Sequence, residues 1–360
     1  MGKVADMKCY ILTSDLQRDR AKKIAEKLES LGLEIASEIE PYSCVVVASG
    51  GTERKILEAV NEPVVVWALP YYNSLPAVLE AYAVKEFRFF YSDIDEKALE
   101  KIKIYERVFN AIKRLRGIRL GIVGGVSDWI VTDGNWVRNL LEVVEIGLED
   151  VRVEGEGVER AYSVYNSLRE IIERYELDAL TIKCFDLLEK DTTACLALHL
   201  LNDEIPAGCE GDLEAVFTMI VLRLLTNQPC WMANINRIGR TAVLSHCTVP
   251  KSMCEYVKLT THMESGKGVG IEGVLRKGIV TIARFRGKRA LIARGRILRG
   301  NLGDETLCRT QVEVETGDLI GFGNHVVLSY GDHVELLKEF CFYTGFEPQI
   351  RGPHHRSVAD

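Results

Sequence analysis

The chain has 360 residues, of which 47% are hydrophobic and 27% charged, a composition typical of a folded protein and too apolar for a disordered one. Its length exceeds what one hydrophobic core usually organises, so we expect two or three domains. Acidic residues outnumber basic ones by 52 to 45, and the formal net charge is −7. This balance argues against nucleic acid or an anionic membrane as the main partner.

Hydropathy and cysteine content indicate a cytoplasmic protein. No apolar run approaches the roughly 20 residues needed to cross a bilayer, and residues 1–7 lack the apolar core of a signal peptide. The ten cysteines contain no CxxC pair and fit neither a zinc ribbon nor a disulfide framework. We therefore expect no membrane partner, and we expect most of the cysteines to be buried thiols.

The first third of the chain alternates short β-branched runs with amphipathic segments, the pattern of strands and crossover helices in a parallel sheet. Strands are expected at Met7–Thr13, Cys44–Ser49 and Val64–Leu69, and helices at Asp15–Leu31 and Thr52–Val60. The pattern predicts a doubly wound, Rossmann-like N-terminal α/β domain over residues 1–116.

A second alternating unit follows. A helix expected over residues 96–116 ends at Gly117, and a strand is expected at Ile118–Val123. Further helices are predicted at residues 134–141, 158–175, 193–202 and 213–225, with a strand at 179–184. We therefore predict a central doubly wound α/β domain, residues 117–238, that carries the acidic site described below.

The sequence pattern changes after residue 238, where glycine becomes frequent and the apolar runs shorten. Residues 278–298 alternate apolar and charged side chains around a Gly287-Lys288 turn, the pattern of a β-hairpin. This predicts a C-terminal antiparallel β-barrel over residues 239–350. Residues 351–360, with two histidines, are expected to form a polar tail.

Two glycine-rich turns follow predicted strands and could present backbone N–H groups to an anion. Gly50-Gly51-Thr52-Glu53 lacks the Lys-Ser/Thr pair of a P-loop, and Gly121-Ile122-Val123-Gly124-Gly125 lacks the third glycine of a dinucleotide fingerprint. These turns are the only feature of the sequence that supports the hypothesis of an NAD-dependent oxidoreductase. We favour simple turns in which glycine supplies positive φ angles.

Carboxylates and an amide lie near predicted helix and strand ends. Cys209-Glu210-Gly211-Asp212 opens a helix, whose dipole favours negative charge at this end. Helix capping explains Asp212 well, whereas for Glu210, in a turn of small residues, capping and a functional role stay open. Asn234 ends an apolar strand, where α/β proteins place ligands, although an asparagine turn explains it better on local grounds.

Among the histidines of the β-rich last third, three are candidate site residues: His246, His262 and His325. Each alone is more often a hydrogen-bonded core residue than a ligand. Together with a carboxylate and an oxygen donor they would suit Mn²⁺ or another hard to borderline ion. No HExxH, HxH or CxxC spacing in the sequence supports zinc.

Several of these segments, in their order and separation, resemble the family of L-fucose isomerase and L-arabinose isomerase, and most of all its shorter fucose-isomerase-like members. The best-matched segments are Ala207–Thr218, Ser245–Pro250, Thr261–Gly270, Cys308–Gln311 and Gly323–Asp332, within a resemblance that runs from Gly50 to His333. It implies an intramolecular oxidoreductase that isomerises an aldose to a ketose through an enediol intermediate. Mn²⁺ or another divalent cation would hold two sugar oxygens while a carboxylate moves a proton between C1 and C2.

The resemblance implies that Glu210 is a metal ligand and an acid/base group, and that His325 is a metal ligand. The third metal and catalytic position, an aspartate in the family, is Asn234 in this chain. An amide oxygen can coordinate an ion but carries no charge and accepts no proton. Either Glu264 or Asp186 replaces the missing carboxylate, or the chain is a sugar-binding or catalytically altered family member.

The resemblance also implies a sugar pocket and an oligomer. The substrate-binding candidates are Lys183, His246, His262, Glu264, Arg309 and Asn324, although Lys183 fits a surface lysine and Arg309 a structural salt bridge equally well. Trp231 fits core packing better than a sugar platform. Family relatives form homotrimers or homohexamers in which one subunit covers the next subunit's pocket, so Gly50–Glu53 and Tyr71–Asn73 become candidate contacts.

Overall fold

The computed structural model describes residues 6–352 and divides into two compact units, one ending at Asn110 and the other beginning at Ala111. The first unit contains a parallel sheet in the order β1-β2-β3-β4. Its strands are β1 (Cys9–Leu12), β2 (Cys44–Val47), β3 (Val65–Ala68) and β4 (Phe89–Tyr91), and its helices are α1 (Arg18–Ser30), α2 (Glu53–Ala59) and α3 (Ser74–Val84), with a 3₁₀ turn at Asp15–Gln17. The division between the units falls within helix α4 (Glu96–Leu115). Every residue of β2 and β3 is buried, as expected of central parallel strands. The predicted α/β pattern is confirmed.

The second unit begins with another parallel sheet, in the order β6-β5-β7-β8. Its strands are β5 (Arg119–Val123), β6 (Glu142–Ile146), β7 (Ala179–Ile182) and β8 (Ala207–Cys209), and its helices are α5 (Gly157–Tyr175), α6 (Cys195–Leu201) and α7 (Leu213–Thr226). Shorter 3₁₀ helices occupy Asn135–Asn139, Leu148–Asp150 and Cys184–Lys190. The helix predicted at residues 134–141 is thus only a short 3₁₀ turn.

An antiparallel barrel of six strands follows, in the order β13-β16-β9-β10-β15-β14 and closed by pairing of β13 with β14. Its strands are β9 (Trp231–Ile238), β10 (Ala242–His246), β13 (Gly278–Arg286), β14 (Arg289–Arg299), β15 (Thr310–Glu315) and β16 (His325–Tyr330). A 3₁₀ turn (Lys251–Met253) precedes a two-stranded sheet, β11 (Cys254–Thr260) with β12 (Gly270–Leu275); α8 (Val334–Thr344) leads to β17 (Glu347–Arg351), parallel to β14. The predicted fold class, two parallel α/β sheets followed by a barrel, is confirmed.

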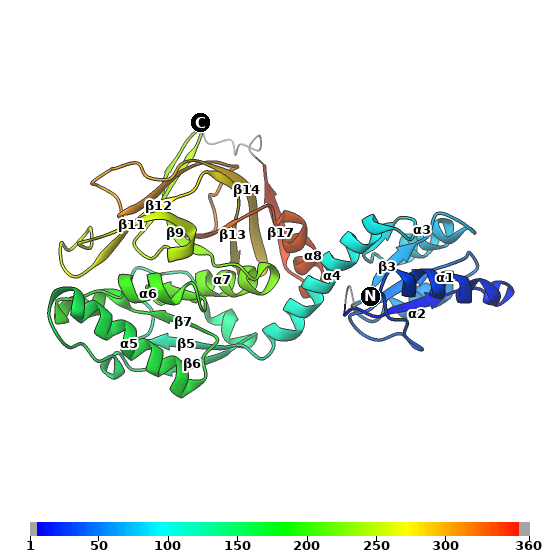
Figure 1. Ribbon diagram of the computed structural model, residues 1–360, viewed down its shortest axis with the longest axis horizontal. Helices are drawn as coiled ribbons and strands as arrows, with labels where there is room; N and C mark the ends of the chain where they lie inside the picture. Colours follow the sequence, from blue (N-terminus) through cyan, green and yellow to red (C-terminus); the bar gives the residue numbers. More distant parts are fainter. Residues whose placement is uncertain (1–5, 353–360) are drawn as a thin grey trace. The chain divides into compact units, whose positions relative to one another are not determined.

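Helix α7 is the shared core element of the second unit. Residues 213–222 are all buried, which is typical of a helix surrounded by other elements. The helix packs against β7 and β8 of the sheet and against β13 and β16 of the barrel, and Figure 1 shows it between these layers. The Thr218 hydroxyl oxygen accepts the Phe285 N–H at 3.0 Å. The start of α7 therefore lies where sheet and barrel meet.

Two details correct the sequence-based boundaries. The strand predicted to end at Asn234 continues to Ile238, because β9 pairs with β10 beyond a register shift. Arg351 belongs to β17 instead of the polar tail, and residues 353–360 lie outside the described residues.

Trp231 is fully buried in the barrel core, as predicted. No helix among residues 6–352 is both long and apolar enough to span a membrane.

The glycine turns have the simple explanation that the sequence favoured. Gly51, Gly124 and Gly125 all have positive φ angles, between 72° and 81°. Gly121 serves close packing instead, since a Cβ there would lie 2.5 Å from Leu177 Cδ1. All ten cysteines are free thiols, and eight of them are buried, as expected.

Candidate functional site

The turn after β8 places Glu210 at the carboxyl end of the second sheet, the edge where α/β proteins bind ligands. Glu210 and Gly211 both have left-handed backbone conformations, with φ of 64° and 70°. A Cβ on Gly211 would lie 2.2 Å from the Gly125 carbonyl oxygen, so only glycine fits. The Ser127 N–H donates to the Glu210 carbonyl at 3.0 Å. The loop after β5 and the turn after β8 thus hold each other and fix Glu210.

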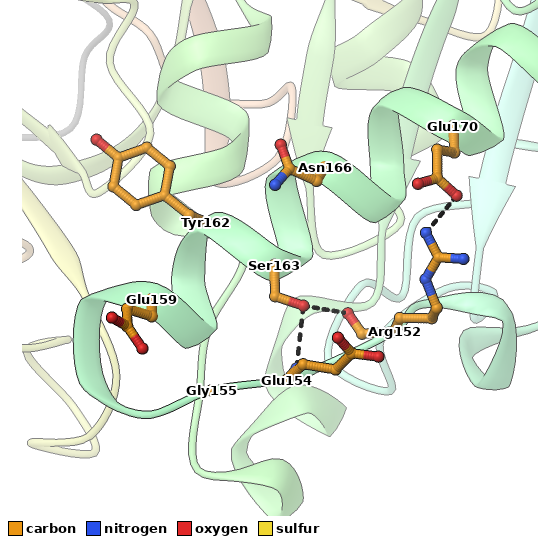
Figure 2. A pocket seen from close by; sticks show the side chains of 8 residues that line it. All are labelled: Arg152, Glu154, Gly155, Glu159, Tyr162, Ser163, Asn166 and Glu170. Carbon is orange, nitrogen blue, oxygen red and sulfur yellow. Dashed lines mark hydrogen bonds and ion pairs between the residues drawn. The ribbon is translucent and has the colours of Figure 1, made fainter.

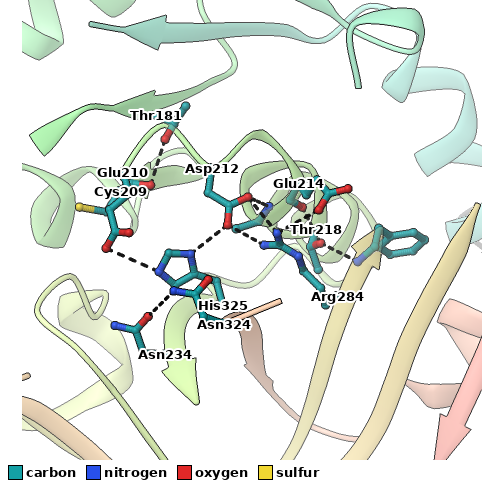
Figure 3. A network of polar contacts seen from close by, with 12 residues as sticks. Thr181, Cys209, Glu210, Asp212, Glu214, Thr218, Asn234, Arg284, Asn324 and His325 are labelled. Atoms are coloured by element: carbon teal, nitrogen blue, oxygen red, sulfur yellow. Dashed lines mark hydrogen bonds and ion pairs between the residues drawn. The ribbon is translucent and has the colours of Figure 1, made fainter. Parts of the chain in front are cut away.

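The Glu210 side chain is buried and its two oxygens have different partners. The indole N–H of Trp129 donates to Oε2 at 2.6 Å. The other oxygen, Oε1, faces His246 Nε2 at 3.7 Å and His325 Nε2 at 3.6 Å. Both Nε2 atoms are buried and have no hydrogen-bond partner among the described residues. A carboxylate oxygen and two imidazole nitrogens therefore converge on one buried place. Figure 3 shows Glu210 and His325 of this group.

The two imidazoles are held in opposite ways. His325 Nδ1 lies 2.9 Å from Asp212 Oδ2, a contact that requires a proton on Nδ1 and leaves the Nε2 lone pair free in the neutral ring. His246 Nδ1 accepts the Cys247 backbone N–H at 3.0 Å, so the ring proton of neutral His246 lies on Nε2. In their neutral forms, His325 therefore offers a lone pair at Nε2 and His246 offers a proton there.

Behind His325 lies a fully buried ion-pair network that starts at α7. The Arg284 guanidinium donates to both oxygens of Asp212 at 3.0 Å and to Glu214 Oε2 at 3.2 Å. Trp136 Nε1 donates to the other Glu214 oxygen at 2.6 Å. Asp212 also caps α7 by accepting the N–H of Ala215, which confirms its predicted role.

The pKa shifts follow from these contacts. Burial would raise the pKa of the Glu210 carboxyl, but the nearby imidazoles of His246 and His325 outweigh it and hold that pKa below its usual range. Burial likewise opposes the low pKa of Asp212, which Arg284 and His325 maintain. For His325, burial would lower the pKa, but Asp212 and Glu210 raise it above the ordinary value.

The donor set and its charge fit a divalent cation. Glu210 Oε1 and His325 Nε2 offer an oxygen and a nitrogen at a spacing that one ion can bridge, and Asp212 orients the imidazole from behind, as outer partners of metal-binding histidines do. Glu210, Asp212 and Glu214 are buried with one guanidinium, that of Arg284, which leaves an excess of negative charge. The Cys209 sulfur also lies within 4.8 Å of donor atoms of Glu210 and His246.

Asn234 lies beside this place. It is directly opposite His325 in the β9–β16 pairing, and side chains of such partners lie on the same face of a sheet. Its Oδ1 accepts an N–H of the exposed Asn324 at 3.1 Å (Figure 3). The structure therefore brings Glu210, His325, Asn234 and Asn324 into one neighbourhood.

The other candidates surround the site less closely. Lys183, after β7, contacts Asp186 at 3.3 Å and Asp128 at 3.7 Å, which satisfies its charge. Asp186 is thereby paired with a lysine. Glu264 is exposed, and neither it nor Asp186 has a contact with Glu210 in the structure described here.

His262 and Arg309 organise the loop after β11. His262 Nδ1 lies 3.0 Å from Ser265 Oγ, and its ring meets the Phe185 ring edge-on. Arg309 Nε donates to the Thr261 carbonyl oxygen at 3.0 Å, a backbone contact in place of the salt bridge considered above. Both residues therefore have local structural partners.

Trp129, Trp136, Glu214 and Arg284 were missed by the sequence analysis. Arg284 left a signal, because it is a single charge inside the apolar run Val280–Phe285. Trp129 left a weaker one: it follows a glycine turn at the end of β5, and its side chain is about half exposed although its N–H is used.

A separate pocket lies along α5 and contains none of the predicted site residues (Figure 2). Its lining includes an Arg152–Glu170 ion pair, and the Ser163 hydroxyl accepts the Glu154 N–H. Its polar groups thus bind one another. In the first unit, the Gly50 N–H donates to the Tyr72 carbonyl at 2.7 Å, which places the two predicted contact segments side by side.

Comparison with known proteins gives a distant relationship. No protein-family model matches the chain. Sulfoquinovose isomerases from Priestia aryabhattai and Priestia megaterium are each 26% identical, over 86% of this chain and 84% of theirs. A sulfoquinovose isomerase from Alkalicoccus urumqiensis is 22% identical over 57% of this chain and 58% of its own. The chain is therefore distantly homologous to sugar isomerases.

Proposed function

We propose that the protein is a divalent-cation-dependent aldose–ketose isomerase related to the fucose isomerase family. The observation that carries the proposal is the buried approach of Glu210 Oε1 to His325 Nε2, 3.6 Å apart, with Asp212 holding the far side of the imidazole. The distant homology to sulfoquinovose isomerases supports the reaction class.

Glu210 and His325 would hold the cation, with the Asn234 amide oxygen as a third, uncharged ligand. A divalent ion, Mn²⁺ in the family it resembles, would supply positive charge to sugar oxygens as they become negative. Glu210 is kept ionised by its surroundings and can accept the proton from the carbon next to the carbonyl. Trp129 fixes the Glu210 carboxylate through Oε2, and burial excludes water.

The sugar would be positioned by groups around this centre. His246 presents an Nε2–H that can donate to a sugar oxygen, as its Nδ1 is occupied by the Cys247 N–H. We propose Lys183, Glu264, Arg309 and Asn324 as the remaining substrate contacts.

The test uses the chain loaded with Mn²⁺ and incubated in D₂O with aldopentoses, 6-deoxyhexoses and sulfoquinovose. We expect ketose from at least one sugar and deuterium at its C2. Glu210→Gln, which keeps the shape but removes the charge, should abolish both, whereas Glu159→Gln in the pocket along α5 should change neither. No ketose and no exchange from any sugar, with the cation shown to be bound, would refute the proposal.

Asn234 favours a second candidate, a sugar-binding protein without isomerase activity. Its amide cannot accept a proton, and its oxygen already takes a hydrogen bond from Asn324. This candidate predicts that a sugar raises the melting temperature of the protein without solvent exchange at C2. Exchange by the unmodified chain would eliminate it, and exchange gained only in Asn234→Asp would establish it.

We also propose a homotrimer or homohexamer, in which the segments containing Gly50 and Tyr72 would contact a neighbouring site. Light scattering after size-exclusion chromatography measures the molar mass directly. A monomer at micromolar concentration would contradict this part of the proposal.

A further inference from the structure

A second cluster of metal-binding side chains lies in the same unit. Ligand atoms of Cys195, Cys247 and His262 lie within 4.8 Å of one another, and all three residues are buried. The thiols of Cys195 and Cys308 both lower the pKa of the buried Cys247 thiol, so Cys308 is a further neighbour of Cys247. Two thiols and an imidazole thus gather in one place, with the Cys308 thiol beside them and outside the pair formed by Glu210 and His325.

The four side chains come from four separate segments of the chain, so no short sequence motif identifies them as a group. Cys195 begins α6, Cys247 follows β10, His262 follows β11 and Cys308 precedes β15. The His262 Nδ1 is hydrogen-bonded to Ser265 Oγ, which fixes the ring and assigns Nε2 to any ligand. This is the outer support that metal-binding histidines usually have.

The chemistry of this set differs from that of the Glu210 site. Soft thiolates with one imidazole select Zn²⁺ or a similar thiophilic ion, whereas carboxylate and amide oxygens suit harder ions. Around tetrahedral zinc, with Zn–S of about 2.3 Å, neighbouring sulfurs lie about 3.8 Å apart. The ligand atoms of Cys195, Cys247 and His262, which lie within 4.8 Å of one another, need only small side-chain movements to reach that geometry.

We propose that Cys195, Cys247, His262 and Cys308 form a structural site for Zn²⁺ or another thiophilic divalent ion. Four protein ligands leave no open position, so the ion would be structural and not catalytic. It would join α6 to three loops around the barrel. One of these loops carries His246, the neighbour of Cys247, so the ion would also steady the edge of the proposed sugar site.

The experiment is a Co²⁺ titration of the full chain, stripped of metal and kept reduced, followed by visible absorption. Cobalt bound to thiolates in a tetrahedral site absorbs strongly through sulfur-to-metal charge transfer, whereas cobalt bound by carboxylate and imidazole does not. We expect one equivalent of thiolate-bound cobalt, which Zn²⁺ displaces. Because this readout requires no turnover, it is independent of the proposed isomerase activity.

Variants locate the ion. Cys195→Ala and Cys308→Ala should each weaken cobalt binding by at least the roughly tenfold loss typical of outer-shell changes. Cys230→Ala, a buried thiol that bonds to the Met219 carbonyl, is the matched control and should keep the band, as should Glu210→Gln. No thiolate–cobalt band in the reduced chain, or an unchanged band in Cys308→Ala, overturns the proposal. Cys308 is only partly buried, so this variant serves if Cys195→Ala does not fold.

Discussion

Replacing Arg284 by methionine tests whether the buried network behind His325 holds the second unit together. The guanidinium makes three hydrogen bonds, of 3.0, 3.0 and 3.2 Å, to Asp212 and Glu214, and its side chain is 1% exposed. Methionine fills similar space but leaves two buried carboxylates without their cation. Removing one partner of such a pair costs about 3–5 kcal/mol of unfolding free energy.

For a folding unit of this size, each kcal/mol shifts the melting temperature by about 2–4 °C, so we expect a loss of about 6–20 °C. Urea unfolding followed by circular dichroism and tryptophan fluorescence measures the free energy. The matched control is Arg152→Met, which breaks an exposed pair with Glu170 and should cost far less, because solvent screens such pairs. Neutralising the stranded carboxylates, with Asp212→Asn and Glu214→Gln added to Arg284→Met, should recover part of the loss.

The reasoning fails if Arg284→Met costs no more than Arg152→Met. It also fails if the triple variant is as unstable as the single one, because the penalty is then lost packing and not uncompensated charge. Arg284 acts on the site through Asp212, which orients His325, and is therefore a positioning residue. Calorimetric titration with Mn²⁺ should show an affinity about 10–100-fold weaker in Arg284→Met, the range for outer-shell partners.

Three further predictions concern the Glu210 turn. Gly211→Ala should destabilise the protein more than Gly125→Ala. Both changes place alanine in a left-handed conformation, which costs about 1–2 kcal/mol of unfolding free energy, but only the Cβ at position 211 would collide with backbone atoms. Equal urea midpoints for the two variants would contradict this. Trp129→Phe removes the hydrogen-bond donor to Glu210 Oε2. Deuterium exchange at the sugar C2 should slow about tenfold, while the unfolding free energy changes by about 1 kcal/mol. An unchanged exchange rate would show that this hydrogen bond does not contribute to proton transfer. Mn²⁺ at 100 times its dissociation constant should stabilise the chain by about 2.7 kcal/mol, and EDTA should reverse this; equal stabilisation of His325→Ala would place the ion elsewhere.

The fold could be predicted from the sequence wherever local pattern and tertiary environment agree. The helix expected over residues 96–116 and the hairpin expected over 278–298 both form within about a residue of the prediction, because amphipathic period and turn chemistry are local properties. The helix expected at 134–141 does not form as an α-helix. In that segment the Trp136 side chain donates a hydrogen bond to Glu214, 78 residues away in the sequence. A local sequence pattern cannot predict such a contact.

The site was less accessible to prediction because its contacts are long-range. Glu210 and His325 were candidates from the sequence alone, but their roles came from a family resemblance, and the residues that surround them in the network were missed. Asp212 looked like a helix cap, which it is, but the same carboxylate also binds His325, 113 residues later, and Arg284, 72 residues later. A cap that also holds a buried pair looks, in sequence, like any other cap.

The opposite settings of His246 and His325 connect this network to the chemistry. If Arg284 did not bind Asp212, only His325 would oppose the rise that burial causes in the pKa of Asp212, and that carboxylate would be protonated more readily. His325 would then lose the acceptor that keeps its proton on Nδ1 and its lone pair toward Glu210. His246 has no such carboxylate behind it, only a backbone N–H, and so presents a proton instead. The buried Arg284 thus supports the setting of His325 through Asp212, whereas the setting of His246 depends on the Cys247 backbone N–H.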